Sequence, residues 1–267
     1  MKNWKRYTLK TLKWLSLVIY LVVGLWFVTK RNRELVCKTI QVQVVDSSEN
    51  SFITSRSIRR VIDQKGKSPI GKTMHSINTY ELEKRISTMM SVRDVQVYKT
   101  SNGVLSVKVK QRRPLVRIFN HKNQSYYIDE QGLILPLSDR FAAHVLVVNG
   151  NIKEPFSVKA NQNVMQRDTS VYRSEPLICK IFNFARYIAD NDFWNAQITQ
   201  VYVDDSNNIE LIPRVGSQVI LLGSFDNYEK KLEKLKMFYE KALPAMGWNK
   251  YKMINLKYSN QIICTKR

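Results

Sequence analysis

The sequence predicts an α+β protein in which one membrane-spanning helix near the N-terminus precedes a soluble part built from strands and helices. Three observations support this prediction. An apolar run occupies residues 12–28, strands and helices follow one another in a defined order between residues 38 and 111, and short strands dominate from residue 112 onward, with a helix and closing strands near the end. With 44% hydrophobic and 24% charged residues, the composition is that of a globular protein, so extensive disorder is not expected.

The apolar run at 12–28 has Lys13 as its only charged residue. As a helix it spans roughly 25 Å, and lysines at its ends can extend the fit to the ~30 Å hydrocarbon layer. No small residues at cleavage spacing follow it, which favours an uncleaved anchor over a signal peptide. We expect a short cytoplasmic tail at 1–11, an anchor at 12–29 and a large domain outside the cytoplasm. The residues expected to hold the anchor in the membrane, including an indole near each end, are Trp14, Leu17, Ile19, Leu21, Leu25 and Trp26.

Residues 38–111 show the order strand, helix, helix, strand, strand. Asn78 followed by Glu81 resembles a capping box, which marks the start of the second helix. Asn102-Gly103 predicts a tight turn before the last strand. Alternating apolar residues predict strands at 39–45, 92–98 and 105–109, and apolar residues at helical spacing predict helices at 55–64 and from 78 onward.

Residues 112–267 predict a second, β-rich domain that begins near Arg113-Pro114. The helix at 226–243 has the clearest apolar stripe, and Pro244 is expected to end it. The polar segment 151–173 is expected to be a loop or an insertion. The other predicted elements are strands at 126–128, 133–135, 145–148, 198–203, 209–212 and 218–222, a helix at 176–189 capped by Ser174, and one or two closing strands over 253–258 and 261–264.

The net charge of +21 leaves nucleic acid, an anionic membrane surface or acidic partners as possible contacts. Lysine and arginine occur singly and in pairs, and no nucleic-acid-binding motif is present, so we expect no nucleic-acid binding. A basic surface close to anionic lipid is the preferred interpretation. Cys37, Cys179 and Cys264 are far apart in the sequence, so they predict neither a disulfide framework nor a metal site, although one pair could be bridged.

Residues 66–73 read GKSPIGKT and match the phosphate-binding string GxxxxGK[ST]. That motif needs an apolar strand before it and a helix that starts at its lysine. Here the preceding residues are polar with helical spacing, and the next helix starts near Asn78, so we expect a loop and no bound nucleotide. The histidines lie in separate segments and the carboxylate pairs fall at predicted turns. The sequence therefore predicts no catalytic residue, no metal site and no cofactor.

Three short motifs occur in order along the soluble part. Residues 111–114 read Gln-Arg-Arg-Pro, residues 127–136 read Tyr-Ile-Asp-Glu-Gln-Gly-Leu-Ile-Leu-Pro, and residues 255–261 read Asn-Leu-Lys-Tyr-Ser-Asn-Gln. They resemble the Glu-Arg-x-Pro junction, the aromatic-x-Asp-x-x-Gly-x-x-x-Pro hairpin and the late Asp-Leu-Arg-Tyr-x-Asn-Gln segment of the bacterial cell-division family FtsQ/DivIB. Gln111, Asn255 and Lys257 depart from that pattern, in which Glu, Asp and Arg are usual.

The resemblance implies a POTRA domain (β-α-α-β-β) at 38–111 and a β-rich FtsQ-type domain at 112–267. It also implies a non-enzymatic scaffold of the division machinery in the bacterial inner membrane, with the C-terminal domain in the periplasm at the septum. The implied partners are the single-pass coiled-coil proteins FtsB and FtsL and, through them, the septal peptidoglycan synthase. The POTRA unit would contact early division proteins.

The last predicted strand is expected to form an edge of its sheet. Edge strands expose unpaired backbone groups and can be extended by a strand of a partner. We hypothesise that this edge is the docking site; the alternative is an ordinary closing strand covered by its neighbours. The hypothesised docking residues are Tyr258, Ser259, Asn260, Gln261, Ile262, Ile263 and Cys264.

Two other functions remain as alternatives to a division scaffold. One is a POTRA-containing component of outer-membrane protein assembly or secretion, although such proteins usually carry repeated POTRA units or a barrel. The other is an anchored cell-wall enzyme, which would need a cleft with convergent polar groups.

Overall fold

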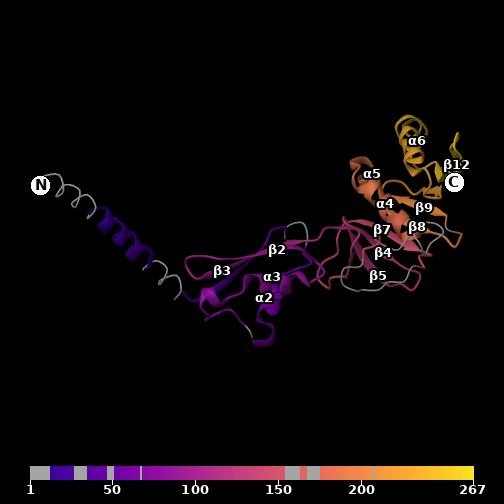
Figure 1. The fold of residues 1–267 in the computed structure, drawn as a ribbon. Helices are drawn as coiled ribbons and strands as arrows, with labels where there is room; N and C mark the ends of the chain where they lie inside the picture. Colours follow the sequence, from indigo (N-terminus) through magenta and orange to yellow (C-terminus); the bar gives the residue numbers. More distant parts are fainter. Residues whose placement is uncertain are drawn as a thin grey trace, which may run out of the picture. The chain divides into compact units, whose positions relative to one another are not determined.

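The computed structural model describes residues 13–26, 35–46, 51–66, 68–153, 163–166, 175–206 and 208–267. The chain divides into two compact units between Gln111 and Arg112, and Ser48–Phe52 is counted with the second unit. Figure 1 shows both units, with the N-terminal residues in indigo and the C-terminal residues in yellow.

Residues 13–26 form a helix whose side chains are exposed along its whole length (Figure 1). Of the helices that the structure describes, none is both long and apolar enough to cross a membrane. The predicted anchor at 12–29 includes Leu12 and residues 27–29, which lie outside the described residues. All the expected anchor residues are exposed on this helix: Trp14, Leu17, Ile19, Leu21, Leu25 and Trp26.

Unit 1 is a three-stranded sheet with the order β1-β3-β2, in which β1 is parallel and β2 antiparallel to β3. The central strand buries Leu105, Val107 and Val109 completely, because every second side chain of a strand points to the same face. Ile58 and Ile86 of the two helices are also fully buried. The elements are β1 (Thr39–Val44), α2 (Ser55–Asp63), η1 (Gln64–Gly66), η2 (Met74–Ser76), α3 (Thr79–Ser87), β2 (Val92–Lys99) and β3 (Val104–Gln111).

The predicted order of elements in unit 1 is confirmed, and so is the start of its second helix. The side-chain oxygen of Asn78 accepts a hydrogen bond from the backbone N–H of Glu81 at 3.1 Å, which satisfies a donor at the beginning of α3. Gly103 adopts a φ of 83° in the predicted turn before β3, a conformation that favours glycine.

Unit 2 contains a nine-stranded mixed sheet with the order β12-β11-β10-β9-β8-β7-β4-β5-β6. The pairs β4–β7, β7–β8 and β10–β11 are parallel, and the other neighbours are antiparallel. Its strands are β4 (Pro114–Phe119), β5 (Ser125–Asp129), β6 (Ile134–Leu135), β7 (Leu146–Gly150), β8 (Ile198–Val203), β9 (Ile209–Pro213), β10 (Val219–Gly223), β11 (Tyr251–Asn255) and β12 (Ile263–Lys266). Its helices are α4 (Leu177–Ala189), α5 (Asp192–Gln197), α6 (Tyr228–Lys241) and α7 (Leu243–Met246).

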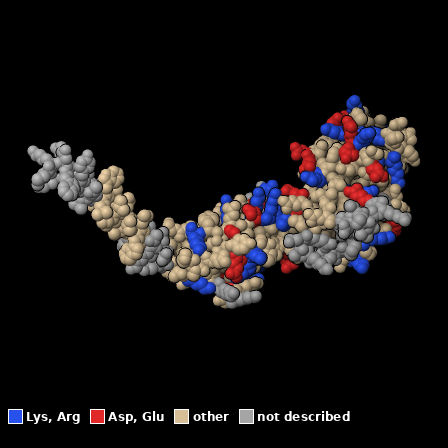
Figure 2. Space-filling view, in the orientation of Figure 1, with Lys and Arg blue, Asp and Glu red and all other residues tan. Residues whose placement is uncertain are grey.

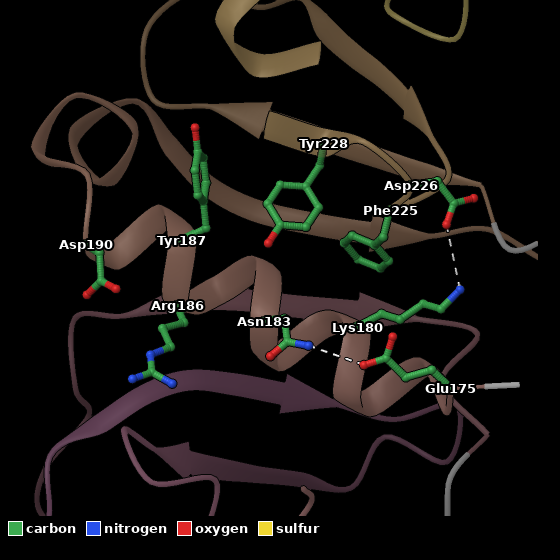
Figure 3. A pocket seen from close by; sticks show the side chains of 9 residues that line it. All are labelled: Glu175, Lys180, Asn183, Arg186, Tyr187, Asp190, Phe225, Asp226 and Tyr228. Atoms are coloured by element: carbon green, nitrogen blue, oxygen red, sulfur yellow. Dashed lines mark hydrogen bonds and ion pairs between the residues drawn. The ribbon is translucent and has the colours of Figure 1, made fainter. Parts of the chain in front are cut away.

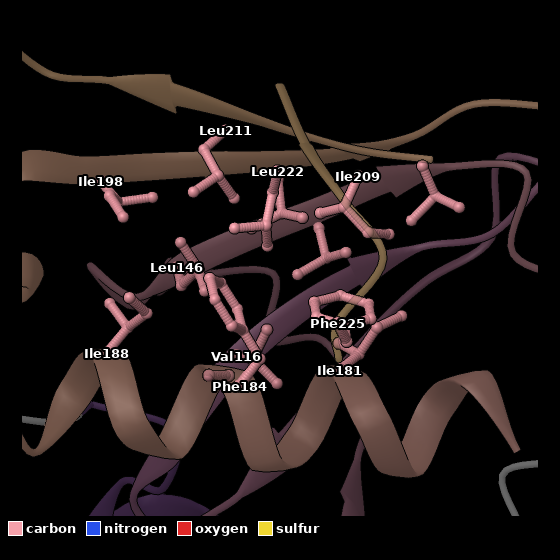
Figure 4. Packing of buried hydrophobic residues seen from close by; sticks show 14 of the residues in the cluster. Val116, Leu146, Ile181, Phe184, Ile188, Ile198, Ile209, Leu211, Leu222 and Phe225 are labelled. Carbon is pink, nitrogen blue, oxygen red and sulfur yellow. The ribbon is translucent and has the colours of Figure 1, made fainter. Parts of the chain in front are cut away.

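The core of unit 2 lies between the helices and one face of this sheet. In Figure 4, Ile181, Phe184 and Ile188 of α4 point toward Leu211 and Leu222 of the sheet. Three residues of the predicted stripe of α6, Leu232, Leu235 and Tyr239, belong to the same buried cluster. The described helices therefore pack on one face of the sheet, and the side chains on the other face are only partly covered.

Some details of unit 2 differ from the sequence prediction. Strand β4 and helix α5 were not expected. The N-cap of α4 is Pro176 and not Ser174, which lies outside the described residues. Helix α6 ends at Lys241, before Pro244 as predicted, and Pro244 stands in the first turn of the separate helix α7, where a missing N–H costs no intrahelical bond. Of the predicted loop at 151–173, the structure describes only residues 151–153 and 163–166.

Candidate functional site

Strand β12 is the outermost strand at one end of the nine-stranded sheet. It pairs antiparallel with β11, with Cys264 opposite Ile254 and Thr265 opposite Met253. Within the described residues no other strand pairs with it. Ile263 is 43% exposed, and Thr265 and Lys266 are also exposed. The backbone groups on the outer side of β12 can therefore accept a further strand.

The loop that leads into β12 is tied to helix α6 by one lysine. The ammonium group of Lys234 donates to the carbonyl oxygens of Tyr258 at 2.5 Å, Ser259 at 3.3 Å and Gln261 at 3.4 Å. Partial burial lowers the pKa of this lysine, because desolvation disfavours its charged form. Ile262 and Cys264 pack against the core on the inner side. The loop is thus held by Lys234 and by the packing of Ile262 immediately before the edge strand.

The structure distributes the hypothesised docking residues over two elements. Ile263 and Cys264 lie in β12, whereas the five preceding residues, 258–262, lie in the loop between β11 and β12. Thr265 and Lys266 complete the strand, and sequence reasoning missed them because the apolar pattern stops at Cys264. Lys234 was also missed: it belongs to the charged face of α6, and no local pattern distinguishes it from its lysine neighbours.

The opposite edge of the sheet, at β6, is covered. Leu135 is only 1% exposed. Asn163 forms an isolated bridge with Leu133, and the backbone N–H of Val164 donates to the carbonyl of Gly132 at 2.8 Å. Residues 163–166 therefore protect the hairpin that ends in β6.

Two of the sequence motifs meet at the beginning of unit 2. Nη1 of Arg112 lies 3.0 Å from Oδ2 of the buried Asp129 and also donates to the side-chain oxygen of Gln131 at 3.0 Å. The other carboxylate oxygen of Asp129 accepts from the backbone N–H of Gln131 at 2.9 Å and of Leu133 at 2.8 Å. Asp129 thus fixes the β5–β6 turn and joins it to the junction motif.

Gln111, which stands where the resembled pattern usually has Glu, is fully buried at the end of β3. Its side-chain oxygen accepts a hydrogen bond from the backbone N–H of Ile53 at 2.7 Å, and its own N–H donates to Oδ1 of Asp46 at 3.2 Å. A neutral amide makes the accepting contact without placing a second carboxylate beside Asp46. This departure is therefore compatible with the local packing.

A pocket of about 540 Å³ lies on the outer side of α4 and beside the start of α6 (Figure 3). At one end, Nζ of Lys180 lies 3.9 Å from Oδ1 of Asp226, and Nδ2 of Asn183 donates to Oε1 of Glu175 at 3.2 Å. Tyr228 lines the pocket, and burial, followed by the neighbouring carboxylate of Glu229, raises the pKa of its phenol to about 12. These groups pair with one another or stay neutral, which suits polar recognition rather than acid–base chemistry.

The phosphate-binding string at 66–73 lies in a different context from that of a nucleotide site. Helix α2 and the short η1 precede it, and α3 begins only at Thr79. No two of the three cysteines, all of which the structure describes, form a disulfide bridge. Among the described residues, no group of three or more His, Cys, Asp or Glu could hold a metal ion.

Comparison with models of protein families adds to this geometry. Residues 113–265 match the model described as FtsQ/DivIB, C-terminal related, and residues 35–110 match the POTRA-like domain. The first match covers more than half of the chain. The chain belongs to the FtsQ/DivIB family. Unit 1 of this FtsQ/DivIB chain is POTRA-like and unit 2 is the β-rich part, so the expected α+β architecture holds for both. A search of curated proteins gave no match.

Membership of the FtsQ/DivIB family makes this a division-related POTRA protein. On the face drawn in Figure 2, basic and acidic side chains are interspersed over both units.

Proposed function

We propose that this FtsQ/DivIB-family chain is a non-catalytic scaffold of the division machinery that binds FtsB- and FtsL-like single-pass proteins. The observation that carries the proposal is the exposed edge strand β12, whose outer side has no strand partner within the described residues. Members of this family are generally scaffolds rather than enzymes, which agrees with a binding role for the edge.

Docking at this edge works by strand addition. The backbone of a partner segment pairs with the outer N–H and C=O groups of β12 and supplies the affinity, while side chains at alternate positions supply the specificity. Ile263 lies on the sheet face away from the core, where a partner side chain can pack beside it. Lys234 positions the loop at 258–262, so the partner meets an ordered surface and less entropy is lost on binding.

We propose the same membrane topology that the sequence predicts. Residues 1–11 form the cytoplasmic tail and residues 12–29 the membrane anchor, with the domains at 38–111 and 112–267 in the periplasm at the septum. The POTRA-like domain contacts early division proteins, and the β-rich domain connects them through its partners to septal peptidoglycan synthesis. The net charge of +21 favours a position close to anionic lipid.

The deciding experiment is affinity capture of the tagged full-length protein from membranes, with proline placed in β12. Adjacent residues of an edge strand point their N–H groups to opposite sides. Of the two single variants Cys264→Pro and Thr265→Pro, one therefore removes an N–H that points outward, away from β11. We expect one of them to reduce recovery of FtsB- and FtsL-like proteins by about tenfold or more, because a lost register removes several backbone bonds. The melting temperature of each variant reports whether the fold persists.

Thr265→Val is the matched control, because it changes the exposed side chain and keeps the backbone donor. Unchanged recovery with both proline variants would move the docking site away from β12. Recovery of outer-membrane assembly factors by the unmodified chain would instead favour a POTRA-containing assembly component, and recovery of no division protein would sink the scaffold proposal.

A further inference from the structure

The face of the unit 2 sheet opposite the described helices contains a hollow of about 410 Å³ that the partner-docking proposal does not use. Strands β7 and β8 form its floor, and the turn between β4 and β5 forms its wall. The described helices of unit 2 contribute to the core on the opposite face. The hollow is therefore separate from β12 and its loop.

Of the residues that the structure describes, no Asp, Glu, Lys or Arg lines this hollow, although the chain carries a net charge of +21. Amide side chains and rings alternate around it. Amides offer both donors and acceptors, and rings offer apolar faces, so the hollow suits a neutral ligand with many polar groups rather than an anion. Its lining residues are Phe119, Asn120, His121, Asn123, Val147, Asn149, Gly150, Gln200 and Tyr202.

An amide pair stands in the floor. Nε2 of Gln200 donates to Oδ1 of Asn149 at 3.0 Å across the parallel pair of β8 and β7. Among the described residues these two side chains have no other hydrogen-bond partner. One amide donor and one amide acceptor remain available, whichever way the two amides are turned. This remaining donor and acceptor lie side by side and complement the amide of a ligand, which also presents one acceptor and one donor.

The β4–β5 turn, which forms the wall of the hollow, is held by hydrogen bonds within the turn and by a contact with Ile152. Oδ1 of Asn120 accepts from the backbone N–H of Lys122 at 3.0 Å and of Gln124 at 2.9 Å, which holds the β4–β5 turn. Nδ1 of His121 lies 3.0 Å from the carbonyl oxygen of Ile152. A neutral imidazole that donates from Nδ1 keeps Nε2 as an acceptor for a hydroxyl group.

Two further features favour a ring-shaped ligand. Gly150 lets β7 approach β8 closely, because a Cβ atom at this position would lie 2.1 Å from the carbonyl oxygen of Val203. Tyr202 stands beside this bare backbone and is 39% exposed, so its ring face can stack on an apolar sugar face. The ring of Phe119 carries the Arg117 guanidinium at 4.7 Å, which leaves Tyr202 as the more accessible platform.

We infer that this hollow binds a neutral oligosaccharide whose sugars carry acetamido groups. The Asn149–Gln200 pair recognises the acetamido amide, Tyr202 stacks on the sugar ring, and Nε2 of His121 accepts from a hydroxyl. No described Asp, Glu, Lys or Arg lines the hollow, and the guanidinium beside it, that of Arg117, already lies over Phe119 and donates to Ser125, so the lining itself offers a charged polymer no counter-charge. An extended peptide finds no free strand edge on a sheet face. The inference does not depend on β12, so the failure of one proposal leaves the other standing.

The test is calorimetric titration of the full-length protein with chitohexaose, whose sugars carry acetamido groups, and with cellohexaose, whose sugars carry hydroxyls instead. A polyoxyethylene detergent is required, because maltoside head groups would compete. We expect binding of chitohexaose to weaken about tenfold in Tyr202→Ala and about fivefold in Gln200→Ala, the range usual for loss of an aromatic anchor or a polar contact.

Tyr202→Phe keeps the stacking face and retains most of the affinity, and Tyr80→Ala, an exposed tyrosine of unit 1, is the matched control. Chitohexaose that gives no binding heat, or that binds equally to the wild type, Tyr202→Ala and Gln200→Ala, would overturn the inference. Equal affinity for cellohexaose would overturn the acetamido assignment. An uncharged peptide that binds when both sugars fail would show that the hollow serves a protein partner instead.

Discussion

The two edges of the unit 2 sheet differ in how they meet solvent. At the β6 edge, Leu135 is buried, and Asn163 and Val164 pair with the hairpin. At the β12 edge, Ile263 is exposed, and the described residues supply no further strand. Exposed strand edges promote aggregation, and natural proteins cover or disrupt them unless they are used. The difference fits the proposal that β12 receives a strand of a partner and that β6 does not.

The largest expected contrast between the edges is in stability. Leu135→Ala should lower the free energy of unfolding by about 3 kcal/mol, because it leaves a cavity in a packed site. Ile263→Ala should cost less than about 1 kcal/mol, since its side chain is already in contact with water. Urea denaturation of both full-length variants, followed by tryptophan fluorescence, gives the two values. Equal losses would show that the edges do not differ in packing.

The second largest expected loss of stability is in the turn before β6. Asp129→Asn should cost about 2 kcal/mol, because Arg112 would keep its charge in a mostly buried site without the carboxylate. The comparison is Asp205→Asn, in an exposed turn of the same unit, which should change stability by no more than about 0.5 kcal/mol. If Asp129→Asn proves equally mild, the ion pair does not stabilise the covered edge.

At the open edge, Lys234→Met should have a smaller effect on stability, about 1 kcal/mol, because carbonyl oxygens near the surface regain water as a donor. Its main effect should be on order: backbone amides at 258–261 should exchange with deuterium faster, and partner capture should fall. Lys230→Met, on the exposed side of the same helix, is the control. Unchanged exchange at 258–261 would mean that Lys234 does not hold the loop.

The smallest expected effect concerns Tyr228 at the start of α6. Burial raises the pKa of this phenol to about 12, so the folded state favours its neutral form. Its stabilising contribution is complete below the unfolded pKa near 10 and is lost as pH rises toward 12. Because the residue is partly exposed, we expect no more than about 1 kcal/mol.

Melting temperatures near pH 9 and near pH 11 measure this loss, since the transition lies between the two pKa values. Tyr228→Phe should lose less stability than the wild type over this interval, and Tyr80→Phe should behave as the wild type does. An identical loss in Tyr228→Phe would contradict the assignment.

The sequence predicted most of unit 1 because its information is local. Alternation through Leu105, Val107 and Val109 and the Asn78 cap each depend on a few neighbouring residues. Strand β4 was missed because it begins with Pro114 and gains its place by parallel pairing with β7, which is distant in the sequence. Short-range patterns cannot show such a pairing, since parallel neighbours need long connections.

The position of the final strand at the edge of the sheet was also predictable, but the residues that form this strand were not. Ile262 and Cys264 pack against the core, and pairing with β11 starts only at Ile263 and continues to Lys266. The hydrogen bonds of Lys234 could not be predicted, because they join a side chain to main-chain oxygens more than twenty residues away. In the same way, Arg112 and Asp129 stood in two separate motifs until folding brought them together.

The hydrogen bonds of Lys234 to the loop have a consequence for how the sequence of this loop can evolve. Its three contacts are with main-chain oxygens, which every amino acid carries. Side chains at 258, 259 and 261 can therefore be replaced without releasing the loop. If this loop binds a partner as proposed, partner preference can diverge between lineages by substitution at these positions, while the contacts of Lys234 that hold the loop are inherited unchanged.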